Sequence, residues 1–141
     1  MNIIEKSLEI ALKAYAGQKD KAGKTYILHP LRIMSKMDSE EEMSVALLHD
    51  VIEDSDITKD DLIKEGIPIH VAEAVNALTK GTNETYEAFI ERIKDNKLAS
   101  KIKKYDIEDN INILRLKSVS ETDLKRIAKY HNAWHILNDN S

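Results

Sequence analysis

Short polar segments in front of apolar runs mark the starts of helices along this chain. Ser39 is followed three residues later by Glu42, and Ser120 by Asp123, which is the capping-box pattern of a helix N-terminus. Glycine and proline, which interrupt helices, number only 4 and 2 among 141 residues. We find no apolar run that alternates with the period of two typical of a strand. The sequence therefore predicts an all-α protein.

Helical periodicity predicts a bundle of about seven or eight helices in one domain that spans residues 1–141. The connections between them are short, which is typical of a single compact bundle. The first helix is expected over about residues 2–16, and a polar loop follows over residues 17–25. The third helix is expected to carry His49 and Asp50, and the seventh to run over about residues 98–114. The expected helix starts lie near residues 2, 29, 39, 58, 68, 86, 98 and 120.

Composition excludes several classes of protein. The net charge of −4 argues against a nucleic-acid-binding surface, which normally has a basic excess. The absence of cysteine excludes disulfides, thiolate zinc sites and cysteine nucleophiles. No apolar run approaches the length that spans a membrane, and the N-terminus lacks the pattern of a secretory signal. We therefore expect a cytoplasmic protein without a membrane or nucleic-acid partner, and the oligomeric state stays open.

Residues 46–54 combine an apolar run with four potential functional groups. His49 and Asp50 end the run, and Glu53 and Asp54 follow one helical turn later. Positions three and four apart share a helix face, so Asp50 is expected to face both later acids. Such a face offers ligands for a divalent cation and carboxylates for proton transfer. These are the groups that metal-assisted hydrolysis requires.

Two further segments supply groups that suit the same ion. His29 stands before a proline, and Asp106 lies in a later helix, so that these two residues with His49 and Asp50 form a mixed nitrogen and oxygen donor set. This set suits manganese, iron, zinc or magnesium, among which geometry would choose. A lone histidine before proline is more often a capping or packing residue. The metal prediction therefore depends on all four residues converging.

Asp106, Asp109 and Asn110 fall at helical positions i, i+3 and i+4 and are expected to share one face. An asparagine amide can both donate and accept hydrogen bonds, which suits it to orient a substrate. Most helical asparagines are merely exposed, so this role for Asn110 is a hypothesis.

The order of these residues resembles a known signature. His29, the pair His49-Asp50, and Asp106 match the pattern of the HD-domain metal-dependent phosphohydrolases. The closer resemblance is to the hydrolase domain of the RelA/SpoT alarmone enzymes and to their small stand-alone relatives, the Mesh1-like proteins. Residues 17–31, 46–58, 75–80 and 103–114 carry it, and it covers roughly residues 4–116.

The resemblance implies a function and a role for each matching residue. The four donor residues named above would hold a manganese ion, and Glu53 and Asp54 would act on the water nucleophile. Asn110 would contact the substrate, and Lys19 and Lys21 lie where the family places basic residues that could meet its phosphates. Loop lysines are otherwise usually just solvated. The implied reaction removes the 3′-pyrophosphate from (p)ppGpp, a small nucleotide of the stringent response.

Two positions depart from the family pattern. Asp20 stands where larger members commonly have arginine, and Asp109 stands where the usual motif Asp-Arg-Leu-His-Asn has histidine. Both put negative charge near an anionic substrate, so the substrate itself stays open. An alternative function is a non-catalytic nucleotide-binding or regulatory protein of the same fold. Glu53 and Asp54 argue against it, because a protein that only binds needs no water-activating pair.

A second histidine pair imitates a different metal site. His131 and His135 lie four apart on the last expected helix, as in zinc proteases, but Asn132 replaces the glutamate base of that pattern. We expect instead a C-terminal helix with Trp134 packed inward and both histidines partly exposed. His70 is likewise expected to be a surface residue.

Overall fold

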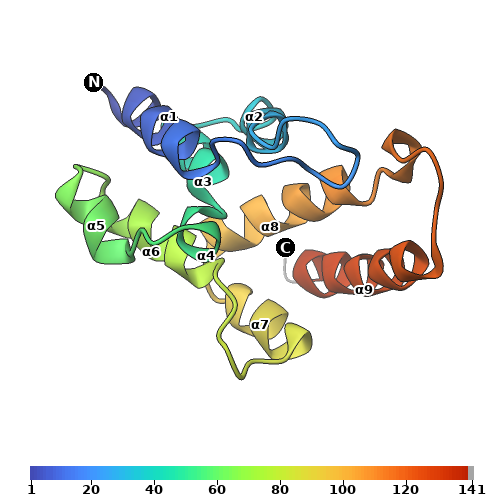
Figure 1. Ribbon diagram of the computed structural model, residues 1–141. Coiled ribbons are helices and arrows are strands. Elements are labelled where there is room, and N and C mark those ends of the chain that lie inside the picture. The colour runs from blue at the N-terminus through green and yellow to red at the C-terminus, as the bar shows by residue number, and fades with distance from the viewer. Residues whose placement is uncertain (140–141) are drawn as a thin grey trace.

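The computed structural model describes residues 1–139, so the last two residues of the expected 1–141 domain lie outside the described part. Within this range the secondary structure is helical (Figure 1), apart from an isolated bridge between Lys19 and Thr25. The all-α prediction is confirmed. The helices are α1 (Ile3–Ala14), α2 (Leu28–Met34), α3 (Glu40–Leu48), α4 (Val51–Asp54), α5 (Lys59–Lys64), α6 (Ile69–Ala77), α7 (Tyr86–Ile93), α8 (Lys97–Asn110) and α9 (Glu121–Asn138), with a 3-10 turn η1 (Ile113–Arg115).

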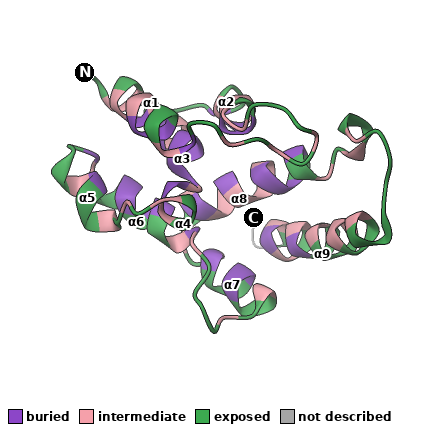
Figure 2. Cartoon of the chain, viewed as in Figure 1, coloured by how far each residue is buried: buried purple, intermediate pink, exposed green. Residues whose placement is uncertain are grey.

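Helix α3 packs against four other helices, namely α1, α2, α6 and α8. Its exposed N-terminus is closed by the predicted capping box, in which the Ser39 hydroxyl accepts from the Glu42 N–H and the Glu42 carboxylate accepts from the Ser39 N–H. From Ser44 to Leu48 every side chain is buried, as the purple segment of α3 in Figure 2 shows. The helix therefore delivers the residue that follows it into the interior.

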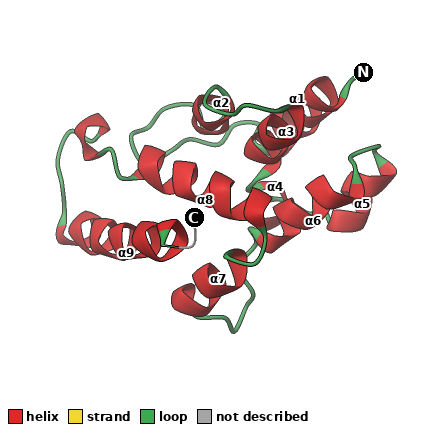
Figure 3. Cartoon of the chain, turned by 180° about the vertical axis from the view of Figure 1, so that it is seen from behind, coloured by secondary structure: helices red, strands yellow, loops and turns green. Residues whose placement is uncertain are grey.

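A single apolar cluster joins the helices. Each of the nine α-helices in the described range contributes at least one buried side chain to it, from Ile10 in α1 to Leu137 in α9. Helix α9 packs on α7 and α8 (Figure 3) and buries Ala133 and Leu137, while Leu124 near its start stays exposed. Among residues 1–139 no helix is both long enough and apolar enough to cross a bilayer.

The expected third helix is not continuous, and this corrects the sequence prediction. It divides into α3 and α4 at His49 and Asp50. A continuous helix would bond the Ala46 carbonyl to the Asp50 N–H. Instead that carbonyl accepts from Nδ1 of His49 at 2.7 Å, and the Asp50 N–H donates to the Tyr15 hydroxyl at 3.1 Å. Side chains that insert into the main-chain ladder in this way are a recognised cause of helix breaks.

The expected seventh helix also ends earlier than predicted. Helix α8 stops at Asn110, and residues up to Leu114 belong to the turn η1 and its approach. The backbone leaves the helical region at Asn112, where ψ is 82°. Arg115 then folds back and donates from Nη1 to the Asp109 carbonyl at 2.9 Å, which satisfies one of the free carbonyls of the helix end. The first helix ends at Ala14, within the usual uncertainty of a helix boundary.

The buried end of α3 should be the most sensitive part of the core near the site. Leu48 has no exposed surface, so Leu48→Ala leaves a cavity and should lower the free energy of unfolding by about 2–5 kcal/mol. Leu124→Ala is the matched control, because Leu124 is 56% exposed and its loss should change stability by less than about 0.5 kcal/mol. Urea unfolding followed by circular dichroism measures both. Equal unfolding midpoints would contradict this placement of α3.

Candidate metal centre

A cavity of about 490 Å³ opens where α2, α4, α8 and α9 meet the loop before α2 and the turn η1. This size is typical of small-ligand sites, although polar side chains dominate its lining. The predicted residues that line it are Lys19, Lys21, His29, Asp50, Glu53, Asp54, Asp106 and Asn110. Sequence reasoning assigned no role to several others, namely Tyr26, Arg32, Lys103, Arg115, Arg126 and Tyr130.

His49 lies behind the cavity and is 2% exposed. Its Nδ1 contacts the Ala46 carbonyl, which can only accept a hydrogen bond, so Nδ1 carries a proton. Its Nε2 is buried without a hydrogen-bond partner, yet it lies 3.2 Å from Oδ2 of Asp50 and 3.4 Å from Oδ1 of Asp106. A lone pair on Nε2 beside two carboxylates is unfavourable unless a proton or a metal cation lies between them. The geometry thus fits a divalent metal ion.

The electrostatics of this pair agree with the geometry. Burial lowers the pKa of His49, but the neighbouring charges of Asp50 and Asp106 outweigh it and raise the pKa well above its usual range. Burial raises the pKa of Asp50, but the histidine beside it and the hydrogen bond from Tyr26 lower it overall. The raised pKa of His49 and the lowered pKa of Asp50 both indicate that this part of the site favours positive charge.

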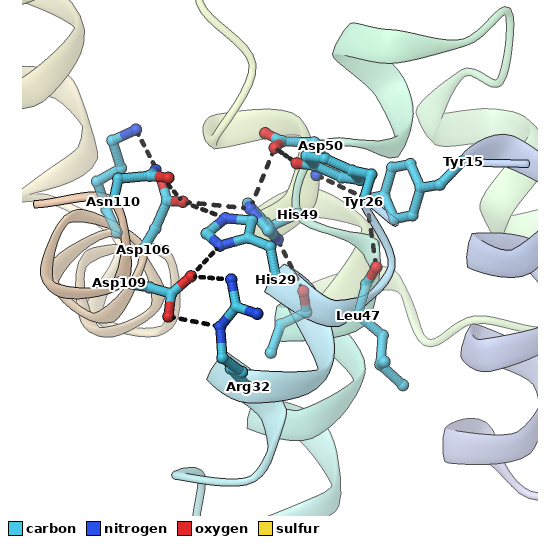
Figure 4. A network of polar contacts seen from close by, with 12 residues as sticks. Tyr15, Tyr26, His29, Arg32, Leu47, His49, Asp50, Asp106, Asp109 and Asn110 are labelled. Carbon is cyan, nitrogen blue, oxygen red and sulfur yellow. Dashed lines mark hydrogen bonds and ion pairs between the residues drawn. The ribbon is translucent and has the colours of Figure 1, made fainter. Parts of the chain in front are cut away.

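Two tyrosines hold Asp50 in place (Figure 4). The Tyr26 hydroxyl donates to Oδ2 of Asp50, and the Tyr15 hydroxyl accepts from the Asp50 N–H while it donates to the Leu47 carbonyl at 3.3 Å. The two tyrosine rings contact each other edge to face, with centroids 4.9 Å apart. Tyr15 falls within the first helix predicted over about residues 2–16, and helical periodicity alone does not indicate that its hydroxyl would form these hydrogen bonds.

His29 stands at the start of α2, where Pro30 is tolerated because the first turn lacks main-chain acceptors. Its Nε2 lies 2.8 Å from Oδ1 of Asp106, and its Nδ1 lies 2.6 Å from Oδ2 of Asp109. Burial lowers the pKa of His29, but the hydrogen bonds with these two aspartates raise it overall. The His29 and His49 rings are 5.2 Å apart, so two histidines from different helices converge.

Asp106 is 5% exposed and lies between both histidines and the half-buried Lys103. Lys103 Nζ donates to its Oδ2 at 3.0 Å, and Asn110 Nδ2 donates to its Oδ1 at 3.1 Å. Burial lowers the pKa of Lys103, but the charge of Asp106 more than offsets this, and the pKa is raised. Burial raises the pKa of Asp106, but Lys103 and the histidines hold it well below its usual range. The carboxylate therefore stays ionised.

Asp20 and Asp109, the two acids that depart from the family pattern, both accept hydrogen bonds from other groups of the protein. Asp20 accepts the backbone N–H groups of Ala22 and Lys24 at 2.9 Å, which shapes the loop. Asp109 accepts from Arg32 and Arg115 as well as from His29. Burial raises the pKa of Asp109, but these hydrogen bonds lower it far below its usual range.

Glu53 and Asp54 follow Asp50 on the next turn and line the cavity, as their spacing predicts, although their side chains are exposed. Partial desolvation in the cavity wall, followed by the charge of Asp50, raises the pKa of both. Lys19 and Lys21 line the same cavity from the loop before α2. Within residues 1–139, the other lysine and arginine side chains that line the cavity each form an ion pair with a carboxylate, whereas Lys19 and Lys21 form none.

Among residues 1–139 one group of three residues has ligand atoms that all lie within 4.8 Å of one another, namely His29, His49 and Asp50. Asp106 is not in that group but contacts both of its histidines.

The second histidine pair does not join the candidate centre. His131 and His135 are exposed on α9, with rings 4.6 Å apart, and Trp134 beside them packs partly into the core. His70 is exposed and pairs with Glu41 at 3.0 Å.

Comparisons with known proteins support the resemblance. No family model matches the chain. A guanosine-3′,5′-bis(diphosphate) 3′-pyrophosphohydrolase from Vibrio cholerae is 41% identical over 81 residues, which are 55% of this chain and 11% of that protein. A protein of the same name from Aquifex aeolicus is 38% identical over 81 residues, which are 55% of this chain and 12% of that protein. The chain therefore spans only about a tenth of the length of these relatives.

A solved structure shares the fold. It is a metazoan orthologue of SpoT, described as hydrolysing ppGpp and acting in starvation responses. The TM-score is 0.78 at 21% identity, and the match covers 97% of this chain and 85% of that one. The resemblance to RelA/SpoT-type hydrolases inferred from the motifs is thus confirmed in sequence and in fold.

The contacts of Asp106 predict that it contributes to cation binding. Asp106→Asn removes the charge that faces His29 and His49, and it should weaken the binding of Mn²⁺ about tenfold or more. Isothermal titration with MnCl₂ measures the affinity, and elemental analysis of the purified proteins measures the metal content. Asp60→Asn, in the exposed first turn of α5, is the matched control. Equal affinity in both variants would remove Asp106 from the site.

Proposed function

We propose that this chain, which resembles the SpoT-type pyrophosphohydrolases in sequence and in fold, is a metal-dependent phosphohydrolase. Its substrate would be guanosine 3′,5′-bis(diphosphate) or a related nucleotide phosphoester, from which it would remove the 3′-pyrophosphate. One observation carries the proposal. The buried Nε2 of His49 has no hydrogen-bond partner and faces the carboxylates of Asp50 and Asp106 at the base of a polar cavity.

The residues that would hold the ion are His29, His49, Asp50 and Asp106. Two imidazoles and two carboxylates suit manganese, which we propose as the cofactor, and also magnesium, iron or zinc. When bound, such an ion polarises a phosphoryl oxygen and lowers the pKa of a water molecule. Tyr26 supports this arrangement, because its hydroxyl bond fixes the direction of the Asp50 carboxylate.

Glu53 and Asp54 would hold the attacking water and accept its proton. Both carboxylates lie on the turn after Asp50 and line the same cavity. Partial desolvation raises the pKa of each, which makes each a stronger base than a fully solvated carboxylate. Either residue can take the proton, and we assign the role to the pair.

The substrate would enter between the loop before α2 and helix α9. Lys19 and Lys21 would meet its phosphates, since they line the cavity without carboxylate partners in the described chain. Asn110 already donates to Asp106 from the edge of α8 and would orient the substrate beside the ion. The names of the relatives favour this hydrolase over the alternative of a non-catalytic nucleotide-binding protein. A cytoplasmic site of action, where nucleotides are available, belongs to the same proposal.

Turnover with Mn²⁺ tests the proposal. The wild-type chain should release pyrophosphate and GDP from ppGpp, and a His49→Ala, Asp50→Ala double variant should be inactive. Glu53→Gln should bind Mn²⁺ normally but lose about 10²–10⁴-fold in kcat, because it keeps the shape of the side chain and loses the base. If Asp54 is the base instead, Asp54→Asn should show this loss. Glu91→Gln, exposed on α7, is the control for a charge change.

The same assay includes GTP, other nucleotides and NADPH. Faster turnover of one of these would correct the substrate and keep the hydrolase. If the wild type turns over none of them, while it and the double variant bind the same nucleotide equally, the enzyme proposal is wrong and the binding alternative is right.

A further inference from the structure

Asp109, near the end of α8, has a carboxylate that accepts an unusually large number of hydrogen bonds. It is 3% exposed, and each of its carboxylate oxygens accepts from two donors. Oδ2 accepts from Nδ1 of His29 at 2.6 Å and from Nη2 of Arg32 at 2.9 Å. Oδ1 accepts from Nε of Arg32 at 2.9 Å and from Nη2 of Arg115 at 2.8 Å. Four donors saturate the accepting capacity of a carboxylate.

The contact with His29 decides which nitrogen of that imidazole can bind a cation. A neutral imidazole has one N–H donor and one lone pair, and the partner of one nitrogen fixes the role of the other. Because ionised Asp109 can only accept, Nδ1 of His29 carries the proton. When a cation replaces the Nε2 proton that now faces Oδ1 of Asp106 at 2.8 Å, the lone pair belongs to Nε2, on the side of Asp106 and His49.

The two arginines fix the carboxylate itself. Arg32 lies one turn after His29 on α2, and its guanidinium forms a two-pronged bond with Asp109, whose geometry is directional. Arg115 approaches from η1 and also donates to the Asp109 carbonyl at 2.9 Å. The carboxylate is thus held by α2, α8 and η1 together, and Figure 4 shows it between His29 and Arg32. Rotation of the carboxylate would break several of these bonds at once.

We propose that Asp109 is a positioning residue that holds His29 with Nε2 presented to the divalent cation. It would act through the histidine and would not touch the substrate or the ion. The arginines Arg32 and Arg115 keep it ionised and fixed in plane. Asp109 occupies the position at which the related motif usually has histidine, so this support would be a feature of this chain. The inference rests on the metal site of the proposed function.

The metal affinity of Asp109 variants tests this role without an activity measurement. Asp109→Ala removes the acceptor of Nδ1 and should weaken Mn²⁺ binding about 10–100-fold in isothermal titration. Asp109→Asn keeps an acceptor oxygen and should recover part of this loss. Arg115→Ala removes an ion pair but leaves the contact between Asp109 and His29, so it should weaken Mn²⁺ binding less than Asp109→Ala does. Glu108→Gln, exposed on the same helix, should bind like the wild type.

Nitrogen NMR of the histidine rings, with diamagnetic Zn²⁺ bound, reports the protonated nitrogen of His29 directly. The wild type should carry the proton on Nδ1, and Asp109→Ala should lose the protected Nδ1 proton signal. This wild-type spectrum remains decisive even where Asp109→Ala fails to fold. A proton on Nε2, or an Asp109→Ala variant with unchanged signal and unchanged Mn²⁺ affinity, would overturn the inference.

The experiment separates this inference from the proposed function. If the wild type binds neither Mn²⁺ nor Zn²⁺, the proposed metal site is wrong, and the inference about metal positioning fails with it. If the wild type binds Mn²⁺ and Asp109→Ala binds it equally well, only the role of Asp109 is wrong.

Discussion

The bond between Nδ1 of His49 and the Ala46 carbonyl is the interaction on which the candidate site depends. It replaces a main-chain hydrogen bond and so ends α3 inside the protein rather than at its surface. The Tyr15 hydroxyl completes the break, because it accepts the Asp50 N–H that has left the helix ladder. As a result Nε2 of His49 and the carboxylate of Asp50 point into the space where α2 and α8 bring His29 and Asp106.

Charge balance is the second constraint on this arrangement. A buried carboxylate is costly in a medium of low dielectric constant unless partners compensate for its lost hydration. Lys103 compensates Asp106, and its ammonium group also lies 5.5 Å from the centre of the Phe89 ring. Arg32 and Arg115 do the same for Asp109. Within residues 1–139 the Asp50 carboxylate has no lysine or arginine partner of this kind, and the space between it and Nε2 of His49 is where we propose that a cation binds.

Local signals in the sequence predicted the helix starts well. The capping boxes at Ser39 and Ser120 form as expected, because their hydrogen bonds join residues three apart and need no tertiary contact. The same reasoning could not find the break at His49, since the apolar pattern continues through it and the cause is a hydroxyl from α1. Local patterns could not predict the ion pair between Arg32 and Asp109 either, because 77 positions separate the two residues in the sequence.

The departure from the family motif at residue 109 gains a different meaning from these contacts. An acid in place of a histidine, taken alone, would add negative charge where an anionic substrate must lie. In this fold the carboxylate is saturated by His29, Arg32 and Arg115, and little of its charge is left to repel a phosphate. Lys19 and Lys21, on the loop shaped by Asp20, are the cations that we propose meet the phosphates of the substrate. Asp109 is therefore compatible with a nucleotide phosphohydrolase, and Asp20 serves the loop by accepting the backbone N–H groups of Ala22 and Lys24.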